Sequence, residues 1–210
     1  QMTTYLENEN ESEFRITVSA RKLIEIIKSL SDSNDISLKI DNNKFIITQG
    51  NSKFSLQTLE AKDFPLINID QNKKATLEIE QNVLKKLFDS TSFSMATQDV
   101  RYYLNGMYLE LNHNELILVS TDGHRLSFNK EQLKKQPNYL VNKETKYSCI
   151  IPRKAVLEIQ KNLNESEKKI YIDFYTNHLM FRTEEKKLIS KLIEGNYPDY
   201  SKVIPKESKI

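Results

Sequence analysis

One stretch of the chain reads Ala75-Thr-Leu-Glu-Ile-Glu-Gln-Asn-Val-Leu-Lys-Lys-Leu-Phe-Asp-Ser90. Its first six residues alternate between apolar and polar, which is typical of a half-buried strand, and the remainder has the spacing of an amphipathic helix. The same order of a short strand and a helix recurs from near Phe14 and from near Lys146. Three further apolar runs follow each helix, so the chain contains three copies of one β-α-β-β-β unit.

The other two predicted helices read Ala20-Arg-Lys-Leu-Ile-Glu-Ile-Ile-Lys-Ser29 and Arg153-Lys-Ala-Val-Leu-Glu-Ile-Gln-Lys-Asn-Leu163. Turn residues separate the strands at equivalent places in the copies. In the first copy, we expect the last strand to include Phe54, Leu56 and Leu59. A spacing of roughly 60 to 72 residues is long for a solenoid, so the unit is expected to recur within or between globular domains.

Composition excludes several classes of protein. Cys149 is the only cysteine among 210 residues, so neither a disulfide framework nor a cysteine-based zinc cluster is expected. No run approaches the roughly 18 apolar residues of a membrane span, and no signal-peptide pattern opens the chain. We therefore expect a soluble, cytoplasmic protein, and Gln1 at the first position suggests a fragment.

The repeats predict how the chain divides into domains. Each three-stranded piece has one apolar face, which its helix and a second unit must cover. The second and third copies, joined by the polar stretch 129–145, would form one complete domain. The first copy has no partner, and residues 1–13 are expected to be the frayed end of a missing unit.

The three predicted helices are basic although the chain as a whole is nearly neutral. They contain eight Lys or Arg and three acidic residues, a net charge of +5 against +2 for the whole chain. Such a layer is the electrostatic footprint of contact with a phosphate backbone. The alternative is that basic residues simply occupy solvated helix faces.

The sequence offers little for catalysis. None of the four glycines forms a phosphate-binding loop, and the three histidines are scattered without ligand spacing, so no cofactor and no metal are expected. Asp122 and His124 beside Ser120 could suggest a nucleophile triad, but a tight turn between two strands does not make these side chains converge. We expect a protein that is not an enzyme, and a hydrolase remains a distant alternative.

Four segments together carry a specific signature. They are Phe93-Ser-Met-Ala-Thr-Gln-Asp-Val-Arg-Tyr-Tyr-Leu-Asn-Gly106, Thr121-Asp-Gly-His-Arg-Leu126, Ile151-Pro-Arg-Lys154 and Glu194-Gly-Asn-Tyr-Pro-Asp-Tyr200. With Phe54-Ser-Leu56 and Asp63-Phe-Pro65, they resemble the bacterial DNA polymerase III β subunit, the replicative sliding clamp, over essentially the whole chain.

This resemblance implies an α+β protein with the DNA-clamp fold, in which helices of repeated β-α-β-β-β units form one inner face and antiparallel sheets lie outside. Residues 1–70 would be the second half of a first clamp domain, 71–74 a linker, 75–197 the complete middle domain, and 198–210 a connector toward an absent third domain. The family's subunits close head to tail into a homodimeric ring around duplex DNA. The present chain alone is expected to stay monomeric.

The resemblance also implies a cleft that binds short apolar peptides of the replicative polymerase, the clamp loader and repair polymerases. The matching positions are Tyr103, Leu104, Thr121, Gly123, His124, Arg125, Leu126, Pro198, Lys202 and Val203. Leu104, Leu126 and Val203 can wall an apolar pocket, although Leu126 and Val203 could instead be ordinary core residues. Half of the family's cleft comes from the third domain, so we expect weak affinity.

Sequence-independent contacts to double-stranded DNA are implied for a second set of positions. Those that match the family are Gln98, Arg101, Tyr102, Tyr103, Arg153 and Lys154, and Lys22, Lys85 and Lys161 would add to the field. Tyr103 could equally pack in a hairpin. The alternative function is a stand-alone protein-interaction module on the same scaffold that never encircles DNA.

Overall fold

The structure, a computed structural model, describes residues 1–4, 14–32, 34–69, 72–139 and 146–204. The chain divides into two compact units, a larger one of Gln1–Leu6 with Ile67–Ile210 and a smaller one of Glu7–Leu66. Among the described residues, no helix is long and apolar enough to cross a membrane.

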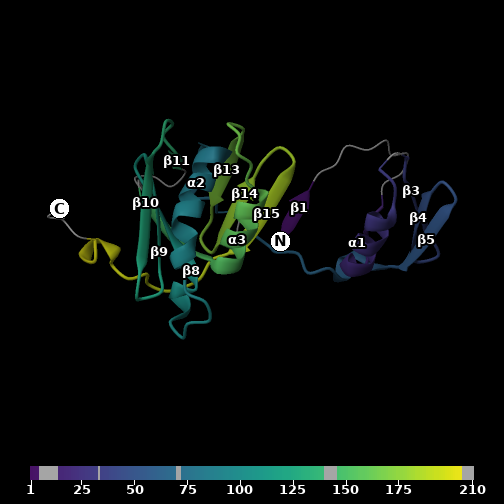
Figure 1. Ribbon diagram of the computed structural model, residues 1–210, viewed down its shortest axis with the longest axis horizontal. Helices are drawn as coiled ribbons and strands as arrows, with labels where there is room; N and C mark the ends of the chain where they lie inside the picture. The colour runs from purple at the N-terminus through teal and green to yellow at the C-terminus, as the bar shows by residue number, and fades with distance from the viewer. Residues whose placement is uncertain (5–13, 33, 70–71, 140–145, 205–210) are drawn as a thin grey trace. The chain divides into compact units, whose positions relative to one another are not determined.

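Two antiparallel sheets form the frame of the larger unit (Figure 1). The six-stranded sheet has the order β1 (Met2–Thr4), β15 (Lys186–Lys191), β14 (His178–Arg182), β13 (Lys169–Phe174), β7 (Ala75–Glu80) and β11 (Asn138–Tyr139). The four-stranded sheet has the order β10 (Leu126–Gln132), β9 (Glu115–Thr121), β8 (Gly106–Asn112) and β12 (Lys146–Pro152).

The second and third sequence copies exchange their first strands. Strand β7 opens the second copy but pairs with β13 of the third, and β12 opens the third copy but pairs with β8 of the second. Each copy thus completes the sheet of the other, so the two copies share their sheets.

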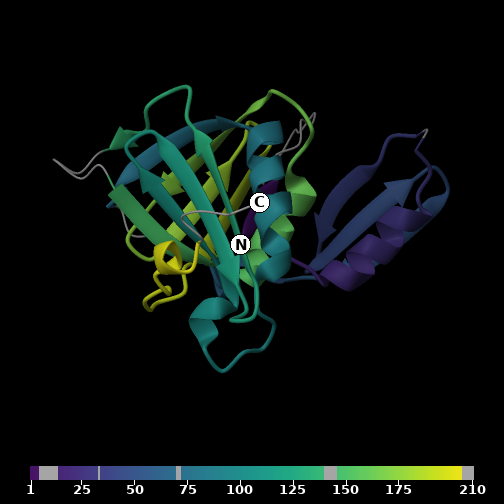
Figure 2. The same cartoon turned by 60° about the vertical axis from the view of Figure 1, so that its left-hand side comes forward.

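Helices α2 (Gln81–Thr91) and α3 (Arg153–Asn162) follow β7 and β12 without a loop. The apolar stripe of α2 buries Leu84, Leu87 and Phe88 completely in a core shared by both sheets. The two helices lie next to each other, as both views show (Figure 2). The Gln160 side-chain amide joins them by donating to Oδ1 of Asp89 at 2.8 Å. The expected α+β class with its antiparallel sheets is confirmed.

The smaller unit is a single copy with a small core. It contains β2 (Ile16–Thr17), α1 (Ala20–Ser29), β3 (Ser37–Asp41), β4 (Lys44–Gln49), β5 (Ser52–Gln57), β6 (Leu59–Glu60) and the 3-10 helix η1 (Ala61–Asp63). Among its described residues, the buried core consists of Phe45, Ile47 and Leu56, and α1 buries no residue. Half of the surface of Ile24 and of Ile27 remains exposed, at 52% each, as expected for a copy without a partner.

The structure differs from the sequence-based expectations in three places. Leu59 does not extend the third strand of the first copy, because the chain leaves β5 after Gln57 and Leu59 pairs with Thr17 of β2. Residues 2–4 are not frayed, since they form β1, which pairs with the edge strand β15. The polar stretch that joins the second and third copies contributes a strand of its own, β11, which pairs with β7.

A buried carboxylate ties β7, β13 and β14 together. Asp173 accepts hydrogen bonds from Nε of Arg182 at 2.6 Å, from Oγ1 of Thr76 at 2.7 Å and from Nζ of Lys73 at 3.3 Å. Burial by itself raises the pKa of the Asp173 carboxyl, but these donors outweigh it, and the pKa falls below its ordinary value. The charged form is therefore the one that the fold stabilises.

We expect Asp173→Ala to lower the free energy of unfolding by about 2–4 kcal/mol, because it leaves the Arg182 charge without its partner in a partly buried site. Urea denaturation measures this loss. Glu78→Ala on β7 is the matched control: it breaks the Glu78–Lys135 ion pair of 2.7 Å, whose lysine is 69% exposed. That control should cost less than about 1 kcal/mol. Equal losses of unfolding free energy in both variants would contradict the stabilising role of the Asp173 carboxylate.

Candidate functional site

A cavity of about 310 Å³ lies at one end of the four-stranded sheet. The turn between β9 and β10, the 3-10 helix η3 (Tyr102–Leu104) and the segment 197–203 form its walls. The lining residues are Arg101, Tyr103, Leu104, Thr121, Gly123, His124, Arg125, Leu126, Tyr197, Pro198, Tyr200 and Val203. Of the positions that the sequence proposed for a peptide cleft, only Lys202 is not among them. Its ammonium instead pairs with Asp199 at 3.1 Å.

The turn at 121–125 is fixed by its own side chains. Oγ1 of Thr121 accepts from the Gly123 amide at 3.0 Å and donates to the Arg125 carbonyl at 2.7 Å. The Asp122 carboxylate accepts from the amides of His124 and Arg125, which lowers the pKa of this carboxyl. Gly123 has φ +89°, where a side chain would be strained. The polar residues of this motif therefore shape the backbone.

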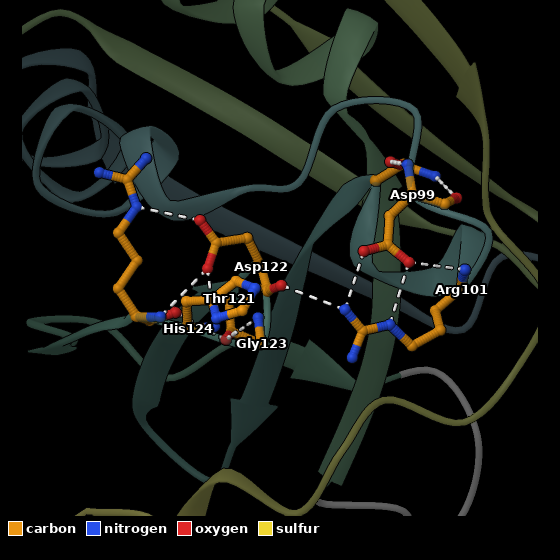
Figure 3. A network of polar contacts seen from close by, with 8 residues as sticks. Asp99, Arg101, Thr121, Asp122, Gly123 and His124 are labelled. Carbon is orange, nitrogen blue, oxygen red and sulfur yellow. Dashed lines mark hydrogen bonds and ion pairs between the residues drawn. The ribbon is translucent and has the colours of Figure 1, made fainter.

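The loop at 99–105 carries a second polar network, drawn in Figure 3. Arg101 donates through Nε and Nη2 to the two carboxylate oxygens of Asp99, at 3.0 and 2.8 Å. This guanidinium lowers the pKa of the Asp99 carboxyl to about 2, so the pair stays charged at neutral pH. The Asn105 side chain closes the loop through bonds to the backbone of Asp99.

Aromatic contacts fix the third wall of the cavity. Tyr197 stacks on Tyr108 of β8, with ring centroids 5.1 Å apart and planes 20° apart. Tyr200 approaches Tyr108 at 5.9 Å and Phe128 of β10 at 5.7 Å. Burial raises the pKa of Tyr108 to about 12, so its phenol stays neutral. The segment that carries Pro198 and Val203 is thus anchored to the sheet by its tyrosines.

The apolar lining is accessible. Leu104 is 2% exposed and supports the floor, whereas Val203 is 65% exposed. Leu126 is half-buried and lies outside the buried core. The alternative that Leu126 and Val203 are core residues therefore does not hold. Sequence reasoning missed Tyr197 and Tyr200 as lining residues, although both stood in the motif quoted for the resemblance.

The residues proposed for DNA contact have unequal surroundings. Lys154 on α3 and Lys22 on α1 are exposed, as are Gln98 and Tyr102. Others already have protein partners: Lys85 pairs with Asp89 and Glu165, Lys161 with Glu158, and Arg101 with Asp99. Arg153 donates to the Met95 carbonyl at 3.3 Å. Tyr103 and Arg101 line the cavity.

The polar residues of the turn are engaged in ways that differ from a catalytic triad. Ser120 is buried and its hydroxyl donates to the Thr91 carbonyl. The Asp122 carboxylate accepts a hydrogen bond from the backbone amide of His124, which is one of the residues that line the cavity. Within the described residues, no group of three His, Cys, Asp or Glu could hold a metal ion. The site is suited to binding an apolar segment.

Comparisons with known proteins show the family to which the chain is similar. The chain matches the family of the DNA polymerase III beta subunit, with its central domain at residues 78–199 and its N-terminal domain at residues 1–68. A "Beta sliding clamp" of Pseudomonas putida is 42% identical over 191 residues, which are 91% of this chain and 50% of that protein. The chain spans about half the length of the curated relatives it matches.

Solved structures that match the chain are of the same family. The crystal structure of the DNA polymerase III subunit beta from Pseudomonas aeruginosa matches with a TM-score of 0.90 and 37% identity, over 99% of this chain and 55% of that one. A sliding clamp from Pseudomonas aeruginosa bound to griselimycin matches with a TM-score of 0.83 and 39% identity, over 92% and 51%. On these matches, the chain belongs to the DNA polymerase III beta subunit family.

Proposed function

We propose that this chain is part of a DNA sliding clamp, a processivity factor that encircles duplex DNA and tethers a polymerase, without chemistry of its own. The observation that carries the proposal is the cavity: residues from three separate segments, which the resemblance implies for a peptide cleft, line one hollow. Membership of the beta subunit family supports the proposal that this cavity binds short partner peptides. Such a role would be exercised in the bacterial cytoplasm.

The partners proposed for the cavity are short apolar peptides of the replicative polymerase, the clamp loader and repair polymerases. Leu126, Pro198 and Val203 offer apolar surface next to the buried Leu104, and His124 and Arg125 are polar residues of the same lining. That a sliding clamp from Pseudomonas aeruginosa is described as bound to griselimycin supports the view that members of this family bind ligands.

The partner proposed for the adjacent helices α2 and α3 is double-stranded DNA. Lys86 and Lys154 are exposed on these helices, which supports attraction without sequence preference. In a protein of the relatives' full length, we propose a head-to-tail homodimeric ring. The competing proposal is a protein-interaction module that uses the same pocket and never encloses DNA.

Circular DNA separates the two proposals. A protein of the relatives' full length, loaded on a nicked circle, should co-elute with that circle in size-exclusion chromatography and be lost after linearisation, because a closed ring slides off a free end. A module that binds DNA only by charge would be retained equally on circular and linear molecules at the same salt concentration. Equal retention would refute the sliding clamp.

A further inference from the structure

Arg101 contacts two segments that have different proposed partners. Its own loop, 98–103, carries the positions proposed for DNA, and the turn 121–125 forms a wall of the peptide cavity. The guanidinium donates twice to Asp99 in its own loop and once, from Nη2 at 3.2 Å, to the Asp122 carbonyl in the turn (Figure 3). One side chain therefore holds the loop and the cavity wall together.

Because Gly123 has no side chain, the Arg101 guanidinium can approach the turn closely. A Cβ atom built on Gly123 would lie 2.9 Å from Nη2 of Arg101, closer than real Cβ atoms approach, and 3.0 Å from Nη1, so the guanidinium would have to shift. The guanidinium therefore lies directly against the backbone of the turn, between Asp99 and Gly123, and remains partly exposed to solvent. Its Nε and Nη2 atoms are engaged, while Nη1 lies against the turn that walls the cavity.

We infer that Arg101 is a positioning residue of the peptide pocket and that duplex DNA and a pocket peptide compete through it. The inference rests on the proposed function. In the arrangement described, the guanidinium supports the turn at 121–125. A phosphate that draws Arg101 away from Asp99 and Asp122 removes this support. By linkage, a bound peptide must then weaken the hold of DNA on the loop by the same factor.

The test measures the affinity of one uncharged peptide, acetylated and amidated Gln-Leu-Ser-Leu-Phe, with and without a saturating duplex oligonucleotide at low salt. Wild-type chain should bind the peptide about fivefold more weakly when the duplex is present. Arg101→Gln and Arg101→Lys should both bind it about tenfold more weakly without DNA, since neither replacement reproduces the planar fork. In both variants the duplex should have no further effect.

Lys191→Gln is the matched control, because it also removes one positive charge but lies exposed at the end of β15 in the other sheet. It should keep the wild-type peptide affinity and the wild-type response to DNA. A merely structural role for Arg101 would change the peptide affinity but leave the response to DNA intact, which would overturn the competition.

Two further outcomes separate the inference from the proposed function. If wild-type chain binds peptide and duplex but the Arg101 variants keep the wild-type peptide affinity, the inference is wrong and the proposed function stands. If wild-type chain binds neither molecule, both are wrong. Thermal midpoints of all variants within a few degrees of wild type would show that the affinities describe folded protein.

Discussion

Leu126→Asp is expected to weaken binding of a Gln-Leu-x-Leu-Phe peptide by more than about 30-fold, to below detection for a weak complex. Burying the Leu and Phe side chains of the peptide contributes about 1.5–3 kcal/mol each before ordering costs, and a carboxylate in the wall loses its hydration when they enter. The starting affinity should be no better than roughly tens of micromolar, about 6 kcal/mol, because only the lining described above is available.

The same substitution should leave the thermal midpoint within about 4 °C of wild type, since Leu126 is half-buried and its pairing with Thr121 uses backbone groups. Val100→Asp is the matched control. It makes the same chemical change on the neighbouring loop, where Val100 is 95% exposed and does not line the cavity. Titration by NMR or calorimetry measures both variants. Loss of binding in Val100→Asp as well would point to a charge effect and contradict the pocket.

Replacing Arg153 and Lys154 by Ala together is expected to reduce the salt dependence of duplex binding by roughly one to two units of slope of log K against log salt. Lys154 should account for most of the change. It is exposed and has no ion-pair partner among the described residues, whereas Arg153 donates to the Met95 carbonyl. Fluorescence anisotropy of a labelled duplex over a salt series gives the slope.

A double variant in the smaller unit provides the control for total charge. Lys44→Ala with Lys53→Ala also removes two exposed positive charges, but from strands β4 and β5 instead of a helix. Its slope should stay at the wild-type value if the helices face the duplex. Equal reductions in the two double variants would show that DNA responds only to net charge, and the helix face would lose its assigned role.

The sequence predicted the repeats well because each has a strong local signal. The helix expected at 20–29 is present with those bounds, and the strand–turn–strand order of the second and third copies is confirmed. What it could not predict depends on pairing between distant residues. The exchange of β7 and β12 between copies and the pairing of Leu59 with Thr17 leave no local pattern, because alternation shows that a strand exists and not which strand it joins.

For the candidate site too, some features could be predicted from the sequence and others could not. The positions taken from the resemblance gather around one cavity, apart from Lys202. The contacts of the charged residues were not predictable: the guanidinium of Arg101, a position proposed for DNA contact, pairs with Asp99 and donates to the Asp122 carbonyl. Whether a basic side chain is available depends on where acidic groups lie in space, as the two carboxylates around Lys85 also show.

The central claim is that the cavity between the turn 121–126 and the segment 198–203 binds partner peptides. NMR shift mapping with the uncharged Gln-Leu-Ser-Leu-Phe peptide tests it most directly, because every backbone amide reports separately. We expect shifts concentrated at residues 121–126 and 198–203 in the wild-type chain, and no such shifts in Leu126→Asp. Shifts confined to the basic helices, with both of these segments silent, would contradict it.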